Sequence, residues 1–457
     1  MQDLKSRFSR FIEFVTSERF FYYYIMTVMI SMPIFEIFEE KHSHSFVAQP
    51  IIVEMAGYVG IFVFVVHFLI HKDIKYYLSD VLYFLLFIFA IISAVLTQNK
   101  FETWHGFDYD EWPFNFVGYF SLMLAGTMIC DKQMRKNILK AFVFVTCIQS
   151  LFAALQTVGI YILECFYKPE MIMENRWCYG LTQNSNWYGG LSVLLFACTA
   201  GIYLFTNNAS TKKAMFVISS ICFYTLIGSE ARLAWVGVFA FIMFLAVSFL
   251  VMKRKGWNKE KMADIKKRFI WLLIAMTIIV VFSILVFGRI VTRIDKTVSE
   301  LNGDNIKEIG SNRVHIWKYG VKAIPKYWAF GIGLDNYEDV FLKSAEYAGG
   351  CKNAKAHNEY LHYLVTQGVF QFATYMTLLV YAAKTGVRNV IKNEDEEERL
   401  INWVLLGMFF GYAAQAFFNS SIVYIVPYFW ITIGMCLSHK NQHWLGYSKE
   451  KKSVEKK

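Results

Sequence analysis

The chain has 457 residues, of which 56% are hydrophobic and only 18% are charged. Because soluble proteins contain about 25% charged residues, this composition excludes a soluble enzyme, a disordered chain and a fibrous protein. The net charge of +10 is also compatible with a nucleic-acid partner, so the positions of the basic residues have to decide that point. The composition predicts an all-α integral membrane protein.

Runs of about 20 mostly apolar residues indicate membrane-spanning helices. Twelve such runs follow one another, and only the turn Gly228-Ser229-Glu230-Ala231 separates the seventh from the eighth. We divide these two runs because their combined length is about twice the thickness of a membrane. The predicted spans are 20–38, 51–70, 78–97, 114–130, 138–160, 188–205, 214–229, 232–252, 269–287, 367–386, 400–418 and 422–437.

The basic residues orient these spans. With the N-terminus inside, the predicted inner segments contain 30 of the 46 Lys and Arg residues, and eleven of the others lie in the loop 288–360. Long loops cross the membrane largely regardless of charge, so this loop is left out of the comparison. The short loops then follow the positive-inside rule when both termini lie in the cytoplasm. Basic inner loops beside anionic lipid headgroups account for the net charge, and no nucleic-acid partner is expected.

We expect three parts along the chain. Residues 1–287 form an N-terminal transmembrane bundle of about nine helices, 288–366 a large extracytoplasmic loop, and 367–457 the C-terminal helices and a basic cytoplasmic tail. The large loop is too long for a simple connector. Within it, 313–330 has Val314, Trp317, Val321, Ile324 and Trp328 at helical spacing with lysines between them, which predicts an amphipathic helix in the outer interface.

A second outer loop, 161–187, contains Arg176-Trp177-Cys178-Tyr179-Gly180 followed by Asn184-Ser185-Asn186. Cys165 and Cys178 both fall in this loop, and whether they form a disulfide stays open. The eight cysteines include no CxxC pair, so neither a zinc site nor a thioredoxin-like motif is supported.

Three ionisable residues lie at predicted outer helix ends: Arg232, Arg313 and His357. Taken singly, each has an ordinary alternative. Arg232 fits an arginine that extends to the interface, Arg313 a solvated surface charge, and His357 a capping or interfacial histidine. Glu230, two residues before Arg232, fits either a neutralising partner of that arginine or a proton acceptor.

Considered together, the three residues indicate one chemistry. Arginine binds phosphate oxygens through two parallel hydrogen bonds, and histidine accepts a proton from a hydroxyl near neutral pH. Two arginines and a histidine on the outer face therefore fit a site that holds a lipid-linked diphosphate and activates a hydroxyl to displace it. No Asp-rich metal site accompanies them, which favours a reaction without a metal or another cofactor.

The residues around these three resemble the signature of the O-antigen ligase/polymerase superfamily. Members of that family show an Arg-x-x-x-Trp, a Gly-x-Gly turn and a His-Asn-x-x-Leu before a helix. The turn ending at Arg232 is similar to the family's Gly/Ser-rich turn, and Asn184-Ser185-Asn186 replaces the usual Asn-Pro-Asn. The matching residues are Arg313, Trp317, Pro325, Gly331-Ile332-Gly333, Asn336, Ala356-His357-Asn358-Glu359-Tyr360-Leu361 and Gly368.

The resemblance implies a C-type glycosyltransferase-like enzyme of the bacterial cell membrane with about 12 spans and an extracytoplasmic active site. Its donor is a glycan on polyprenyl (undecaprenyl) diphosphate, and an in-line attack inverts the anomeric carbon. Arg232 and Arg313 match the arginines that contact the diphosphate, and His357 matches the base. Asn358 and Glu230 lie beside these groups, and Arg176 and Asn186 match a loop near the glycan. These seven residues form the predicted site: Arg176, Asn186, Glu230, Arg232, Arg313, His357 and Asn358.

Polymerase and ligase share this donor chemistry and differ in the acceptor, which is another lipid-linked glycan in the first case and lipid A core, a wall polymer or a protein in the second. We favour a surface or capsular polysaccharide polymerase, with a flippase and a chain-length regulator as possible partners. A 12-helix transporter or flippase is a weaker alternative, because no internal repeat is evident. A scaffolding protein would leave the outer basic and histidine residues without a role.

Overall fold

The computed structural model describes residues 2–38, 48–70, 76–105, 112–163, 178–182, 184–254, 257–302, 312–342, 355–443 and 445. Every regular element within these ranges is a helix, and eight helices are long and apolar enough to cross a membrane. The chain is thus an all-α membrane protein, as its composition predicts. The eight helices are α2 (Glu18–Phe38), α3 (Ala48–Ile70), α4 (Leu78–Leu96), α7 (Lys132–Thr157), α8 (Ser185–Phe205), α10 (Arg232–Arg254), α11 (Lys259–Phe287) and α16 (Glu396–Gln415).

Four more helices occupy the remaining predicted spans. They are α6 (Pro113–Met128), α9 (Ala209–Gly228), α15 (Glu359–Lys392) and α17 (Val426–Cys436). Among these, α6 has 16 residues and α17 only 11, so neither is as long as the usual span. Every predicted span therefore coincides with a helix, while the number of complete crossings stays a prediction.

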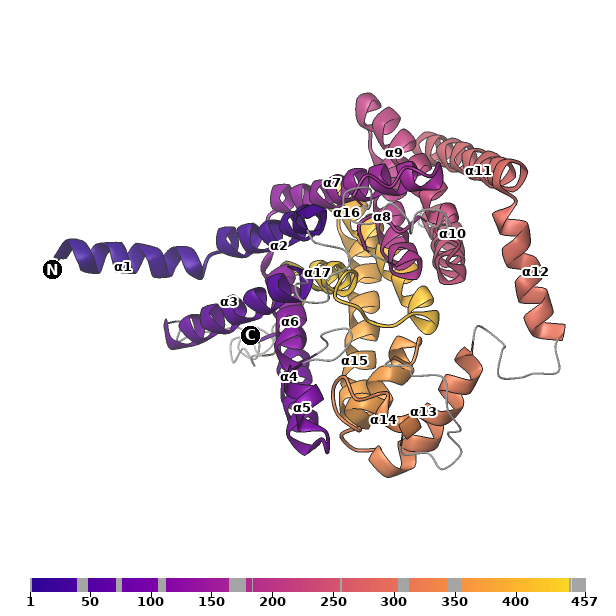
Figure 1. Ribbon diagram of the computed structural model, residues 1–457. Helices are drawn as coiled ribbons and strands as arrows, with labels where there is room; N and C mark the ends of the chain where they lie inside the picture. The colour runs from indigo at the N-terminus through magenta and orange to yellow at the C-terminus, as the bar shows by residue number, and fades with distance from the viewer. Residues whose placement is uncertain are drawn as a thin grey trace.

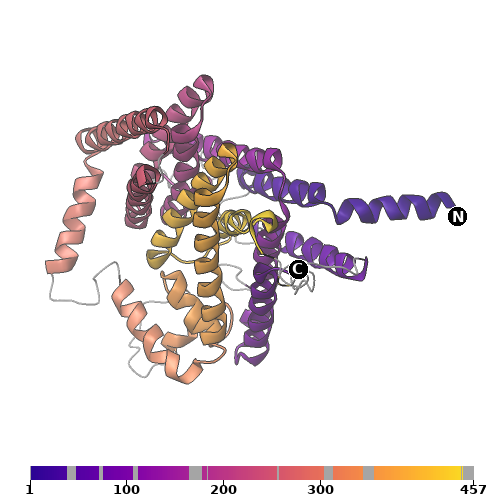
Figure 2. The ribbon, with the colours of Figure 1, turned by 180° about the vertical axis from the view of Figure 1, so that it is seen from behind.

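The centre of the bundle is α8, whose apolar residues are almost completely buried. It packs against α7, α9, α10 and α16 (Figure 1). A helix that is apolar on every side has to be surrounded by other helices. By contrast α1 (Gln2–Val15) extends away from the bundle in both views (Figures 1 and 2).

The helix α15 is broken at Gly368, where φ is 82° and ψ is −179°. This conformation is accessible essentially only to glycine. It divides α15 into two legs, 359–367 and 369–392, and the bend brings the ring of Tyr363 onto that of Tyr375, with centroids 4.5 Å apart. The short first leg therefore lies against the long second leg, and the second leg begins where the tenth span is predicted.

A turn at 328–333 fills the break. The amides of Ile332 and Gly333 donate to the carbonyls of Val365 and Thr366 at 3.0 and 2.9 Å, and the amide of Val369 donates to the carbonyl of Trp328 at 2.7 Å. A broken helix leaves backbone groups without their helical partners, and these three bonds satisfy them. The Gly-x-Gly turn is therefore a structural partner of the broken helix.

The segment before this turn contains two helices, α12 (Arg289–Asn302) and α13 (Arg313–Tyr327). The predicted helix is confirmed as α13, and its position in the outer interface stays a prediction. The residues buried against the protein are Ile316, Tyr319 and Gly320, whereas Val321 and Trp328 are each 55% exposed. Packing against the first leg of α15 decides which face is buried, and this cannot be read from hydrophobicity alone.

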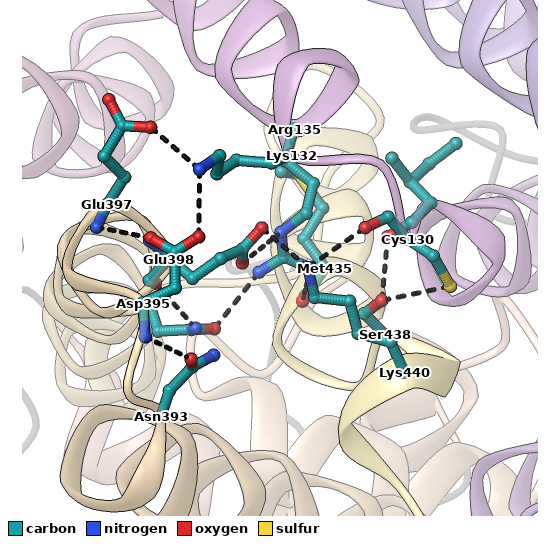
Figure 3. A network of polar contacts seen from close by, with 12 residues as sticks. Cys130, Lys132, Arg135, Asn393, Asp395, Glu397, Glu398, Met435, Ser438 and Lys440 are labelled. Atoms are coloured by element: carbon teal, nitrogen blue, oxygen red, sulfur yellow. Dashed lines mark hydrogen bonds and ion pairs between the residues drawn. The ribbon is translucent and has the colours of Figure 1, made fainter.

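At one end of the bundle, a buried ion network joins α7, α16 and the segment after α17 (Figure 3). The side chain of Arg135 is fully buried and donates to the Met435 carbonyl at 3.0 Å and to Asn402 at 3.1 Å. Glu398 lies between two cations, 3.6 Å from Arg135 Nε and 2.6 Å from Lys440 Nζ. This network is distant in sequence from the predicted site and fixes the ends of three helices together.

Candidate functional site

The first part of the site is the turn between α9 and α10. Here α9 ends at Gly228 and α10 begins at Arg232, so the predicted division of these two helices is confirmed. The buried Ser229 hydroxyl donates to the Leu226 carbonyl at 2.6 Å and accepts the Ala231 amide at 3.3 Å. Glu230 has φ of 55°, which is unusual for a residue with a Cβ.

Arg232 is the first residue of α10. A positive side chain at a helix N-terminus is opposed by the helix dipole, so this placement does not stabilise the helix. The guanidinium Nη1 donates to the hydroxyl of Thr297 on α12 at 3.0 Å. Helix and side chain together present positive charge, which is the arrangement that binds an anion.

Arg313 repeats this arrangement, because it is the first residue of α13. Asn312, immediately before it, has φ of 68°. One turn further along α13, the indole N–H of Trp317 donates to the carbonyl of Ala356 at 2.9 Å. The helix that begins with Arg313 therefore contacts the loop that contains His357.

His357 lies in that loop with φ of 47°, directly before the first leg of α15. Its amide donates to the hydroxyl of Ser420 at 3.1 Å. Burial, followed by the positive charge of Arg313, His362 and Lys355, lowers the pKa of the imidazole from 6.5 to about 4. Arg313 and His357 are thus close enough to interact electrostatically, and the imidazole is neutral at pH 7.

The residues after His357 anchor its loop. Asn358 is the N-cap of α15, and its side chain accepts the Leu361 amide at 3.0 Å. Glu359 is 2% exposed and accepts hydrogen bonds from the hydroxyls of Tyr375 at 2.5 Å and Tyr412 at 2.8 Å. Asn358 is therefore engaged in helix capping, which also explains why the motif needs an asparagine there.

A fourth turn completes this part of the molecule. Asp335 follows the Gly-x-Gly turn with φ of 57°, and the buried Lys355 Nζ lies 3.9 Å from its carboxylate. Asn336 is fully buried and donates to the hydroxyls of Thr97 at 2.8 Å and Thr103 at 2.7 Å. These contacts connect the Gly-x-Gly turn to the end of α4 and to α5 (Lys100–His105).

Backbone strain is concentrated in these turns. Within the described ranges, four non-glycine residues have positive φ: Glu230, Asn312, Asp335 and His357. Three of them are candidate residues or stand within two residues of an arginine of the predicted site, and Asp335 lies beside Lys355, two residues before His357. Such conformations each cost on the order of 1–3 kcal/mol and gather at ligand-binding and catalytic sites.

The remaining predicted residues lie at the edge of this region. Asn186 is in the first turn of α8, where its amide donates to the side chain of the N-cap residue Asn184 at 2.8 Å. A Cβ on Gly189 would overlap Ala231, so the start of α8 packs directly on the turn before Arg232. Arg176 and Cys165 lie outside the described residues, while Cys178 is buried and its thiol donates to the Thr225 carbonyl at 2.9 Å.

Sequence reasoning missed Thr297 and Ser420. Ser420 belongs to the buried polar segment Asn419-Ser420-Ser421 between α16 and α17. Asn419 bonds to the Ser420 amide and to Gln415, both at 3.0 Å. Three consecutive polar residues inside an otherwise apolar stretch are the signal that could have identified this segment.

An apolar cavity of about 710 Å³ extends from this region between α10, α15 and α16. Val236, one turn after Arg232, and Tyr360, three residues after His357, both line it. Val251 and Ile391 line the far part. Arg232 and His357 are therefore located near one end of the same cavity.

One family model matches this region of the chain. Residues 215–376 match the family model described as O-antigen ligase. The matched segment includes Arg232, Arg313, His357 and Gly368, which are the residues that carry the resemblance found in the sequence. Comparison with curated proteins gives no match.

Proposed function

We propose that this chain, a member of the O-antigen ligase/polymerase superfamily, is an inverting glycosyltransferase that polymerises a surface polysaccharide. In this proposal it transfers a glycan from polyprenyl (undecaprenyl) diphosphate to an acceptor hydroxyl at the outer face of the bacterial cell membrane. Both termini are then cytoplasmic. Flippase and chain-length regulator are its expected partners.

The observation that supports this function best is that Arg232, Arg313 and His357 each lie in a strained turn or directly after one. Two of these turns precede helices that begin with an arginine. Helix N-termini and guanidinium groups both favour a diphosphate. A scaffold or a transporter has no need for strain at these three places.

The proposed reaction uses His357 as the base. The neutral imidazole accepts the proton of the acceptor hydroxyl while that oxygen attacks the anomeric carbon. The bond from this carbon to the diphosphate oxygen breaks, and the carbon inverts. Arg232 and Arg313 stabilise the negative charge that develops on the leaving diphosphate, so no metal is required. The proton leaves His357 after the product has departed.

The donor's isoprenoid tail has a complementary surface in the apolar cavity between α10, α15 and α16. The cavity begins one helical turn from Arg232, so a tail in it places the diphosphate beside the arginine. An apolar chain packs there against apolar side chains, as helices do against lipid within the membrane. Glu230, Asn186 and Arg176 remain proposed glycan contacts at the edge of this site.

The test is transfer by the full-length protein in proteoliposomes supplied with a lipid-linked oligosaccharide. Arg232→Ala, Arg313→Ala and His357→Ala should each reduce glycan transfer by at least about a hundredfold. Arg254→Ala, at the other end of α10, and His443→Ala are matched controls that should retain the wild-type rate. Wild-type rates in all three site variants would overturn the proposal.

The products separate the alternatives. A polymerase yields a ladder of lipid-linked glycans of increasing length. A ligase yields no ladder and requires a different acceptor, such as lipid A core, a wall polymer or a protein. A transporter moves the lipid-linked glycan between leaflets and leaves every glycosidic bond unchanged.

A further inference from the structure

We propose that Trp317 and Ser420 are positioning residues that hold the loop of His357 in its left-handed conformation from two different parts of the structure. The inference rests on the proposed role of His357 as the base. It assigns a function to the tryptophan of the Arg-x-x-x-Trp motif and to a serine that lies outside the matched segment 215–376. Neither residue is proposed to touch the substrate.

The conformation of His357 needs external support. Its φ of 47° is disfavoured for a residue with a Cβ, and the chain would relax toward negative φ if nothing held it. Strained residues persist where the surrounding structure determines them from several directions. The contacts of the loop therefore show what maintains the strain.

Trp317 acts on the residue before His357. Its indole N–H donates to the Ala356 carbonyl at 2.9 Å, and Ala356 is fully buried. Because Trp317 follows Arg313 by four residues, both lie on the same side of α13. One helix thus supplies a diphosphate-binding group at its first residue and a support for the base one turn later, so the two groups keep a fixed relation.

Ser420 acts on His357 itself. Its hydroxyl accepts a hydrogen bond from the His357 amide at 3.1 Å. Ser420 as a whole is only 1% exposed. Ser420 is fixed in turn, because its amide donates to Asn419 and Asn419 donates to Gln415 at the end of α16. After the loop, Glu359 joins α15 to Tyr412 on α16. The backbone of His357 is thus fixed to α13 on one side and to α16 on the other.

The experiment uses Trp317→Phe, which removes the indole donor and keeps an aromatic ring, and Ser420→Ala, which removes the hydroxyl. Each should lower kcat on the order of tenfold to a hundredfold, because small displacements of a catalytic group have effects of that size. The KM for the lipid-linked donor should stay within about twofold. The acidic limb of the pH profile should move up toward the ordinary histidine value, since a released imidazole is better solvated.

Conservative and matched variants define the role. Ser420→Thr keeps the hydroxyl and should restore most of the activity. Trp328→Phe, an exposed tryptophan next to α13, and Ser192→Ala, a buried serine of α8 bonded within its own helix, should leave rate and profile unchanged. If one of the two test variants does not fold in detergent, the other decides the question, because the two residues act on the loop from different elements.

A double-mutant cycle gives the decisive result. In a His357→Gln background, Trp317→Phe should have no further effect on the residual rate, because the tryptophan acts through His357. An undiminished loss in that background, or wild-type rate and pH profile in both single variants, overturns the inference. Failure of the proposed function is distinct: His357→Ala and Arg313→Ala would then transfer glycan as well as the wild type.

Discussion

The guanidinium of Arg232 donates to the hydroxyl of Thr297 at 3.0 Å and so joins the first residue of α10 to α12. In both views α12 continues from the end of α11 along the outside of the bundle (Figures 1 and 2). A guanidinium carries five N–H donors, and this bond uses one of them. Thr297 therefore sets the direction of an arginine proposed to bind the donor.

We expect Thr297→Val to weaken donor binding without affecting the base. The net contribution of one ordinary hydrogen bond corresponds to roughly threefold to tenfold, and we expect an increase of that size in KM for the lipid-linked donor. The value of kcat should change less than twofold. Steady-state transfer rates at varied donor concentration in proteoliposomes measure both quantities.

Thr277→Val is the control for that measurement, since Thr277 is on the neighbouring helix α11 and donates only within it in the described contacts. It should leave KM unchanged. An equal KM for Thr297→Val and wild type would show that the Thr297 bond does not orient Arg232 during turnover.

The pH dependence of transfer should differ from that of an ordinary histidine. The pKa of His357 is lowered to about 4 by burial and by nearby positive charge, so the free enzyme keeps the neutral base at pH 5. The acidic limb of kcat/KM should lie near pH 4. A bound diphosphate favours the protonated imidazole, so the limb of kcat should lie at higher pH. Rates measured from pH 4 to pH 8 test both statements.

Lys355→Gln should move the acidic limb of kcat/KM upward. It removes one of the charges that lower the pKa of His357, and it leaves the carboxylate of Asp335, which lies 3.9 Å from Lys355 Nζ, without that cation. Both changes favour the imidazolium. A limb that moves downward, or a wild-type limb already near pH 6.5, contradicts the electrostatic account of His357.

The sequence predicts the helices well and the tertiary contacts poorly. An apolar run long enough to span a membrane contains about 20 residues that all indicate a helix, and every predicted span coincides with a helix. Arg232, Arg313 and His357 could be proposed from the sequence because each stands at a predicted helix end and within a motif that resembles the family's. Thr297 is 65 residues from Arg232, and Ser420 is 63 residues from His357. Pairs this distant are joined only by packing, which no local pattern encodes.

Substitution of Gly368 by alanine should be severely destabilising. Its φ of 82° disfavours any side chain, and a Cβ there would overlap the carbonyl oxygen of Ala329. Gly331, at φ of 75°, meets the backbone of Thr366 in the same way. Each alanine variant should lose roughly 3 kcal/mol or more of unfolding free energy, because backbone strain and steric overlap add. Reversible unfolding in detergent measures the loss.

Gly159→Ala is the matched control for these glycines. It has φ of 86°, but a Cβ there meets no atom within 4 Å. Only the backbone strain remains, so the loss should be about 1–2 kcal/mol. If the three variants lost equal stability, the close approach of the 328–333 turn to the broken helix would contribute nothing.

The two neighbouring glutamates Glu397 and Glu398 should differ strongly in their contribution to stability. The side chain of Glu398 is 4% exposed between Arg135 and Lys440, so Glu398→Gln leaves a buried arginine without its anion (Figure 3). This change should cost roughly 3–5 kcal/mol of unfolding free energy. Glu397 is 54% exposed and pairs with Lys132 and Lys136, and Glu397→Gln should cost less than about 1 kcal/mol because solvent screens such pairs.

Since both residues are far in sequence from the proposed site, neither variant should alter the KM for the donor while the protein is folded. Equal losses of stability would mean that water reaches the Arg135 network, and the ends of α7, α16 and α17 would then be held mainly by apolar packing.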